Sequence, residues 1–184
     1  MTRSTLTTPP PGAEPPKTHP DGPSAGGSLG SHFSRCFGCG DDHPTGLHIA
    51  AVTPDGASVE AAFTVGESHQ GAPGLAHGGV LASAMDEVIG MSIWLLRKPY
   101  VTARLETDYL LPVPVGTTLH LRAWCTGIAG RKAYLEAEGR VGAPGGPVAV
   151  RAAALFIEVD MTHFAEHGDL AALQAEHQDY EVNP

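Results

Sequence analysis

Basic residues are scarce in this sequence of 184 residues, which has 11 lysines and arginines against 20 aspartates and glutamates. The formal net charge is -9. A protein that binds nucleic acid needs a basic face toward the phosphates, so we expect no nucleic-acid partner. The imbalance is strongest near the C-terminal end, where seven acids but no lysine or arginine follow Arg151.

Cysteine is also rare, and the three cysteines are Cys36, Cys39 and Cys125. An odd number of cysteines, with no apolar secretion signal at the N-terminus, indicates a reducing compartment and not a disulfide framework. The apolar run at residues 80–96 is a little short for a membrane span and is interrupted by two acids. We therefore expect a soluble, cytoplasmic protein that has no membrane partner.

Aromatic residues are missing from residues 1–32, which hold no Phe, Tyr or Trp but seven of the sixteen prolines. Such a segment buries too little apolar area to offset the entropy of ordering it. We expect a disordered leader over residues 1–32 and one domain over residues 33–160. An acidic extension follows over residues 161–184, with one or two short helices expected within residues 162–177.

Alternation of apolar and polar residues predicts six strands around one long helix. Val59, Ala61 and Phe63, for example, alternate with Glu60 and Thr64, which is the period of a half-buried strand. The predicted strands cover residues 47–53, 57–65, 100–111, 117–126, 132–141 and 147–159, and the predicted helix covers residues 78–96. The order β-β-α-β-β-β-β, with one helix against a single antiparallel sheet, indicates the α+β class.

The predicted helix opens on His77-Gly78-Gly79 and carries Asp86 and Glu87 in an otherwise apolar sequence. Glycines at a helix start let another group approach the free N–H groups closely, and a buried acid is costly unless it is paired or used. At about 100° per residue, small side chains and one acid form a stripe, and Glu87 lies to one side of it, toward solvent or the rim. The stripe consists of Gly79, Ala82, Ser83, Asp86 and Gly90. The pattern predicts that the helix N-terminus binds a negatively charged or polarised oxygen of another group, with a carboxylate two turns further along the helix.

Cys36 and Cys39 have the spacing of metal ligands, and His43 follows nearby. A structural zinc ion usually takes four ligands, and no second pair of cysteines supplies the others. The alternative, a glycine-rich turn with two small buried thiols, is the interpretation that we favour. We therefore expect no metal and no cofactor, and a zinc-dependent interaction module built on the two cysteines stays open as an alternative.

The element order, with His-Gly-Gly opening the one long helix and an acid eight residues after the first glycine, resembles the hotdog-fold acyl-CoA thioesterases. The likeness is greatest to the phenylacetate-pathway type and to the human thioesterase-superfamily members. Cys-Phe-Gly-Cys-Gly at residues 36–40 and His-Gln-Gly-Ala-Pro-Gly at residues 69–74 resemble one subgroup. Over residues 33–159 the resemblance implies a hotdog fold, in which a single antiparallel sheet wraps the central helix. It also implies hydrolysis of an acyl-CoA or acyl-carrier thioester by a homodimer or homotetramer.

The resemblance assigns roles to residues of the helix start. Asp86 matches the family carboxylate that acts as nucleophile or as general base for water. The backbone N–H of Gly78, with Gly79 beside it, matches the donor that polarises the thioester carbonyl, and His77 matches the histidine that orients the site. In the family dimer, Asp86 of one subunit faces the Gly78 end of the other.

Two further positions follow from the same resemblance. Thr102 matches a hydroxyl that helps to place the attacking water in some members. Family members have Asn or Gln in the loop before His-Gly-Gly; here Gly71 stands six residues before His77, and Gln70 is adjacent to it.

Paired cations occur twice in this acidic sequence, as Arg97-Lys98 and as Arg131-Lys132. They are candidates to contact the phosphates of coenzyme A. A solvated helix end and a solvated turn explain them equally well, and both interpretations stay open.

The chemistry of a thioester agrees with this set of residues. Its hydrolysis builds negative charge on the carbonyl oxygen, which a helix N-terminus stabilises through an N–H group and the helix dipole. No Gly-x-Ser-x-Gly elbow is present, and Ser83 on the small-residue stripe has no evident base. The alternatives are a hydratase or dehydratase on the same fold and a non-catalytic protein that binds or senses acyl-CoA.

Overall fold

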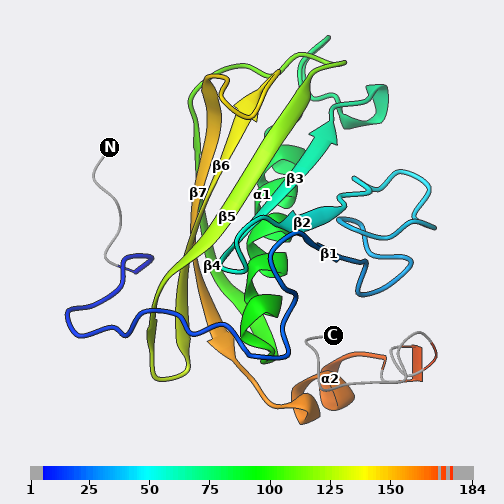
Figure 1. The fold of residues 1–184 in the computed structure, drawn as a ribbon. Coiled ribbons are helices and arrows are strands. Elements are labelled where there is room, and N and C mark those ends of the chain that lie inside the picture. Colours follow the sequence, from blue (N-terminus) through cyan, green and yellow to red (C-terminus); the bar gives the residue numbers. More distant parts are fainter. Residues whose placement is uncertain (1–5, 170, 173–174, 176–184) are drawn as a thin grey trace.

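The computed structural model describes residues 6–169, 171–172 and 175. One long helix, α1, lies against the concave face of a twisted sheet (Figure 1). The elements in chain order are β1 (Gly27–Leu29), β2 (Ala51–Thr53), β3 (Ser58–Thr64), η1 (Glu67–His69), α1 (Gly78–Ile93), η2 (Trp94–Leu96), β4 (Tyr100–Tyr109), β5 (Thr118–Ala129), β6 (Lys132–Val141), β7 (Val148–Glu158) and α2 (Met161–His167). This arrangement confirms the predicted α+β class, with one central helix and a single antiparallel sheet.

The sheet has the strand order β1-β2-β3-β5-β6-β7-β4, and all neighbours are antiparallel. Strand β4, which follows the helix, therefore lies at one edge of the sheet and pairs only with β7 among the described residues. The core forms between the helix and the concave face, and its fully buried side chains include Met85, Ile89, Leu119, Leu121 and Leu135. Each such side chain contributes about 1.5–3 kcal/mol through the area that it removes from water.

The residues of α1 explain where the helix begins and ends. His77 is extended, with φ -69° and ψ 134°, and its side chain caps the helix by accepting a hydrogen bond from Gly79 N–H. At the other end the chain tightens into η2 and then turns at Arg97, which has a left-handed φ of 49°. The segment Gly78–Leu96 is long and apolar enough to cross a membrane, but it is the core helix here and is 61% buried.

The predicted first strand is shorter than expected. Residues 47–53 alternate in sequence, yet only Ala51–Thr53 form β2. His48 has a positive φ of 50°, which an extended strand does not allow, and its Nδ1 contacts Gly40 O at 2.9 Å. The chain before β2 therefore pairs with the cysteine segment, where Leu47 N–H donates to Phe37 O at 2.8 Å and Ile49 N–H donates to Gly38 O at 2.9 Å.

The leader differs from the expectation of disorder over its described part, residues 6–32. Within it, β1 pairs with β2, and Glu14 forms an isolated bridge with Ile128. Thr7 is buried and donates a hydrogen bond to Glu106 Oε2 at 2.9 Å. The reason is that backbone pairing to the sheet holds the segment, and the low apolar content of the segment did not predict this pairing. In Figure 1 the segment, in blue, passes along one end of the strands.

Near the C-terminus, α2 is capped by Asp160, whose carboxylate accepts a hydrogen bond from Thr162 N–H. It begins within one residue of the helix that the sequence predicts at residues 162–177. Part of that predicted range lies outside the described residues. The domain boundaries at residues 33–160 stay a prediction.

Candidate active site

The N-terminus of α1 presents one free backbone donor. Gly79 N–H donates to His77 Nδ1 at 2.9 Å, so the capping histidine occupies it. Within the described residues no acceptor contacts Gly78 N–H, and Gly78 O accepts a hydrogen bond from the Tyr109 hydroxyl at 2.9 Å. Of the two predicted donors, Gly78 N–H is therefore the one available to a ligand, and Tyr109 of β4 holds the next peptide, between Gly78 and Gly79, in place. No sequence signal identified Tyr109.

The loop before the helix is braced by Gln70. Its Nε2 donates to Glu67 Oε2 at 2.8 Å, and its Oε1 accepts from Gly74 N–H at 2.7 Å. Gly71 packs directly on the capping histidine, because a Cβ added there would lie 2.9 Å from His77 Cα. In this structure Gln70 thus shapes the loop. At Gly71, the position where family members have Asn or Gln, His77 packs so closely that it leaves no space for a side chain.

Asp86 lies two turns along the helix, at the wall of a cavity of about 270 Å³. The hydroxyl of Thr102 on β4 donates a hydrogen bond to Asp86 Oδ1 at 3.1 Å. Burial raises the pKa of the Asp86 carboxyl, and the hydrogen bond from Thr102 opposes that rise. The other side chains lining the cavity include Trp94, Tyr100, Val101 and Phe156. Asp86 and Thr102, which the sequence assigned to one site, are in contact.

The small-residue stripe predicted on α1 is the part of the helix that the sheet leaves uncovered. Its members, Gly79, Ala82, Ser83, Asp86 and Gly90, are half-buried or exposed, whereas the opposite face is buried. Ser83 Oγ donates to Gly79 O at 2.9 Å. The hydroxyl is thus engaged with the helix backbone, which argues against Ser83 as a nucleophile.

Gly78 and Asp86 are not brought together within one chain. Eight residues at 1.5 Å per residue separate them by about 12 Å along the helix axis. One thioester carbonyl cannot contact both, so a single chain holds two separate parts of the predicted site.

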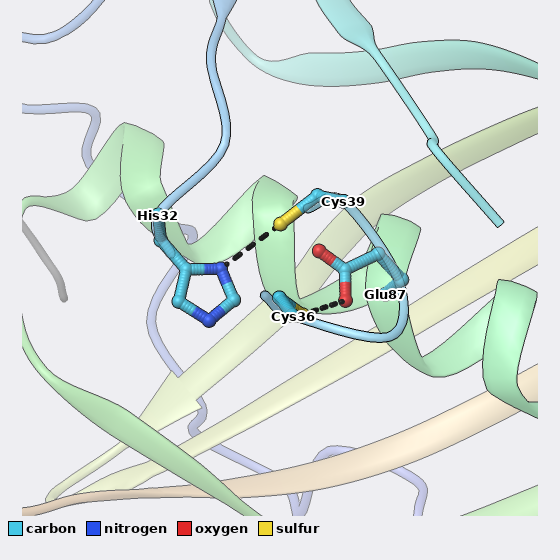
Figure 2. Close-up of side chains that lie close together, drawn as sticks. All are labelled: His32, Cys36, Cys39 and Glu87. Atoms are coloured by element: carbon cyan, nitrogen blue, oxygen red, sulfur yellow. Dashed lines mark hydrogen bonds between the residues drawn. The ribbon is translucent and has the colours of Figure 1, made fainter. Parts of the chain in front are cut away.

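Glu87 was expected toward solvent or the rim, and the structure corrects this. Its carboxylate points to a cluster of His32, Cys36 and Cys39, with Cys36 Sγ 3.7 Å from Glu87 Oε2 (Figure 2). The reason is that the cysteine segment folds over this side of α1 and covers it. Burial is the main cause that raises the pKa of Glu87, to about 7.

The four predicted phosphate-binding cations gather near the opposite end of the helix from Gly78. Lys98 pairs with the Glu158 carboxylate at 3.1 Å, and Arg131 Nε donates to Glu158 O at 2.9 Å. Arg97 donates to Asp21 O at 2.7 Å, and Lys132 is exposed at the start of β6. Their role toward phosphate stays a prediction.

Comparison with known proteins confirms the resemblance that the sequence motifs indicated. Residues 73–147 match the model of the thioesterase superfamily. A segment of 76 residues is 32% identical to acyl-coenzyme A thioesterase THEM4 of Xenopus laevis and covers 41% of this chain. That segment spans only 34% of the length of the frog protein.

Solved structures confirm the hotdog fold. The structure of RHA08564, a thioesterase superfamily protein, is 29% identical with a TM-score of 0.63; the likeness covers 68% of this chain and 61% of that one. The PaaI protein of E. coli, from the phenylacetic acid degradation operon, is 18% identical with a TM-score of 0.57, over 62% of this chain and 81% of its own. A hypothetical thioesterase of Streptococcus pneumoniae, solved with coenzyme A, is 19% identical with a TM-score of 0.53, over 56% and 82%. The last two likenesses show the fold alone.

Proposed function

We propose that this protein hydrolyses an acyl-CoA or acyl-carrier thioester, with Asp86 as the catalytic carboxylate. The observation that carries the proposal is the contact between Asp86 and Thr102 at the wall of a cavity. An acid at this depth is costly, because burial disfavours its charged form, and binding alone has little need of it. The match to the thioesterase superfamily and the frog acyl-coenzyme A thioesterase support the reaction class.

In the proposed reaction, the thioester carbonyl oxygen accepts a hydrogen bond from Gly78 N–H at the positive end of the helix dipole. Asp86 either takes a proton from the attacking water or attacks the carbonyl carbon itself. The carbon–sulfur bond then breaks, and the carrier leaves as a thiolate that gains a proton. Where Asp86 itself attacks, water then hydrolyses the acyl-aspartate anhydride, which releases the acid and restores the carboxylate. Thr102 holds the carboxylate, and His77 fixes the helix start through its hydrogen bond with Gly79.

We propose further that the enzyme is a homodimer, with each site built from both subunits. The uncovered stripe of α1 and the open edge of β4 lie next to one another, and both would be covered by a second copy. Apolar side chains near Gly78 are exposed, among them Leu75 at 36%, Tyr109 at 53% and Leu110 at 48%. Antiparallel helices from two copies would bring Asp86 of one to Gly78 of the other, which a single helix keeps about 12 Å apart. Two such dimers could form a homotetramer.

The substrate side of the proposal is coarser. The Streptococcus pneumoniae neighbour was solved with coenzyme A, and Arg97, Lys98, Arg131 and Lys132 are the cations that we propose for its phosphates here. Lys98 would have to leave Glu158 to serve. A cytoplasmic location is proposed because Cys36, Cys39 and Cys125 are free thiols, which a reducing compartment preserves.

A panel of acetyl-, aromatic, medium-chain and long-chain acyl-CoA thioesters tests the proposal by the release of free thiol. We expect turnover of at least one substrate, and its loss in Asp86→Asn. Binding of acyl-CoA without turnover on the whole panel would favour the non-catalytic alternative. Hydration of an enoyl-CoA, with the thioester intact, would favour the hydratase alternative.

A further inference from the structure

Four metal-binding side chains meet on the side of α1 that faces the cysteine segment. His32, Cys36, Cys39 and Glu87 each offer one donor atom, and these atoms all lie within 4.8 Å of one another (Figure 2). Three of the residues come from residues 32–39, and the fourth comes from the middle of the helix. The spacing of the cysteines was visible in the sequence, but the other two donors were not.

We propose that these four side chains bind one zinc ion, through two thiolates, one imidazole nitrogen and one carboxylate oxygen. Sulfur and nitrogen donors in a group of four are typical of zinc, and a fourth ligand from a carboxylate occurs among zinc sites. Four protein ligands leave no open position, so the ion would be structural and would not activate water. This inference rests on the cluster itself and is independent of the proposed thioesterase activity.

Two donor–donor distances in the cluster are near those that a zinc ion requires, and the others are at most 4.8 Å. Cys39 Sγ lies 3.2 Å from His32 Nδ1, and Cys36 Sγ lies 3.7 Å from Glu87 Oε2. In a tetrahedron with metal–ligand bonds of roughly 2.0–2.3 Å, neighbouring donors are about 3.3–3.8 Å apart. Binding therefore needs only small movements of side chains that already point to a common centre.

The cysteine segment is built closely around these donors. Gly38 N–H donates to Cys36 Sγ at 3.3 Å, and Ser31 Oγ donates to Cys39 Sγ at 3.5 Å, so each sulfur accepts a hydrogen bond that would stabilise a thiolate. A Cβ added to Gly38 would meet the Glu87 carboxylate. Glycine between the two cysteines is thus what admits Glu87 to the cluster.

A turn with two inert thiols does not explain this arrangement. Two small buried thiols need neither a carboxylate nor an imidazole beside them. A half-buried carboxylate is costly without a positive partner, and a disulfide between Cys36 and Cys39 would leave Glu87 only the imidazole of His32 in the cluster. A divalent cation would neutralise the carboxylate and both thiolates to a net charge near -1, as the two thiol protons leave.

The ion would fasten residues 31–40 to α1 at the residue that follows Asp86. His32 and Glu87 line the same cavity as Asp86 and Thr102. His32 also contacts Trp94 edge-to-face, with the ring centroids 5.9 Å apart. Zinc would therefore fix one wall of the cavity from behind.

Metal analysis of the full chain, purified without a metal-affinity tag, tests the proposal. After incubation with Zn²⁺ and removal of loose metal by a weak chelator, we expect about one zinc per chain. Cys39→Ser and Glu87→Gln should retain at least about tenfold less zinc under the same conditions. Two matched controls should keep the wild-type amount: Cys125→Ser, which removes the cysteine outside the cluster, and His43→Ala, which removes the histidine nearest to it in sequence.

A second measurement decides the question if the ligand variants do not fold. Co²⁺ added to the wild-type protein should give the tetrahedral and thiolate charge-transfer absorption bands of a two-sulfur site, and one equivalent of Zn²⁺ should remove them. A strong chelator should lower the Tm of the zinc-loaded protein by about 5 °C or more. Three results would overturn the proposal: wild-type protein that retains no zinc, folded Cys39→Ser with undiminished zinc, or a Co²⁺ spectrum without thiolate bands. Mass spectrometry that finds a Cys36–Cys39 disulfide in zinc-treated protein would overturn it as well.

Discussion

The Thr102 hydroxyl donates a hydrogen bond to Asp86 Oδ1 across 3.1 Å and joins the edge strand β4 to the middle of the central helix. The two residues are 16 positions apart in the chain. The family resemblance gave Asp86 its role through the helix motif and gave Thr102 its role through the strand that follows the helix. Burial has the larger effect on the ionisation of the carboxylate and raises the pKa of Asp86, and the bond from Thr102 opposes the rise.

Replacing Thr102 with Val should move the acid limb of the pH–rate profile to higher pH. The proposed reaction uses ionised Asp86, so kcat/KM falls as pH decreases through the pKa of this group. Loss of the hydroxyl removes a bond that favours the charged form, and the pKa of Asp86 rises further. A hydrogen bond to a charged group is worth about 1.5 kcal/mol, so we expect roughly tenfold lower kcat/KM at the same pH along the acid limb.

Thr102→Ser is the matched control, because it keeps the hydroxyl and loses only a methyl group. Its acid limb should coincide with that of the wild-type protein. An unchanged limb in Thr102→Val would show that the bond to Asp86 does not govern the titrating group.

Asp86→Asn should abolish thioester hydrolysis and yet make the protein more stable at neutral pH. In the wild-type chain the raised pKa of Asp86 means that the folded state holds its proton more tightly than the unfolded state. Stability is therefore greatest below the ordinary carboxyl pKa of about 4 and is lost as pH rises from there through the raised pKa. Asn does not ionise, so the variant avoids this loss, and we expect a gain of about 0.5–2 kcal/mol.

Urea unfolding of the variant and the wild-type protein at several pH values measures this difference. The advantage of Asp86→Asn should shrink as pH falls through the raised pKa of Asp86 and should vanish below about 4, where Asp86 is protonated in both states. Glu60→Gln is the control, because Glu60 is exposed on β3 beside Arg122 and should gain no comparable stability at neutral pH. A variant that is less stable than wild type at pH 7 would contradict the assigned cost of burying Asp86.

Gly78→Pro should remove the proposed carbonyl donor and leave the helix intact. Proline lacks the backbone N–H but is well tolerated at the first position of a helix, which Gly78 occupies. The residue before a proline must be extended, and His77 already has φ -69° and ψ 134°. Loss of one such donor typically lowers kcat by about 10²–10³.

Gly78→Ala keeps the N–H and tests whether added bulk causes the effect. Its Cβ would lie 3.5 Å from the Tyr109 ring, which is an ordinary contact. The alanine variant should therefore retain far more activity than the proline variant, with circular dichroism and Tm similar for both. Equal losses in the two variants would point to steric exclusion of substrate and away from the N–H.

Local sequence was enough to predict what depends on periodicity. The strand pattern predicted β3 to β7, and the spacing from Gly78 to Asp86 predicted the face of the core helix that carries Asp86, because side-chain direction in these elements follows from residue number. Glu87 was misplaced because its neighbours, Cys36 and Cys39, are about fifty residues away in the sequence. The segment that carries them is irregular, so no periodic sequence pattern shows where it lies on the helix. His32 was overlooked for a related reason, since its proline-rich surroundings predicted disorder while backbone pairing in β1 holds them on the sheet.

Mixing two inactive variants should restore activity if each site is shared between subunits. Gly78→Pro and Asp86→Asn are each expected to be inactive as homodimers. In a mixed dimer, one site receives both defects and the other receives Gly78 and Asp86 intact from different chains. Random assembly makes about half of the dimers mixed, so about a quarter of all sites should be active.

Coexpression with two different tags isolates the mixed dimer, which should have about half of the wild-type kcat with an unchanged KM. A mixed dimer as inactive as its parents would place Gly78 and Asp86 on one chain, and this would contradict the shared site.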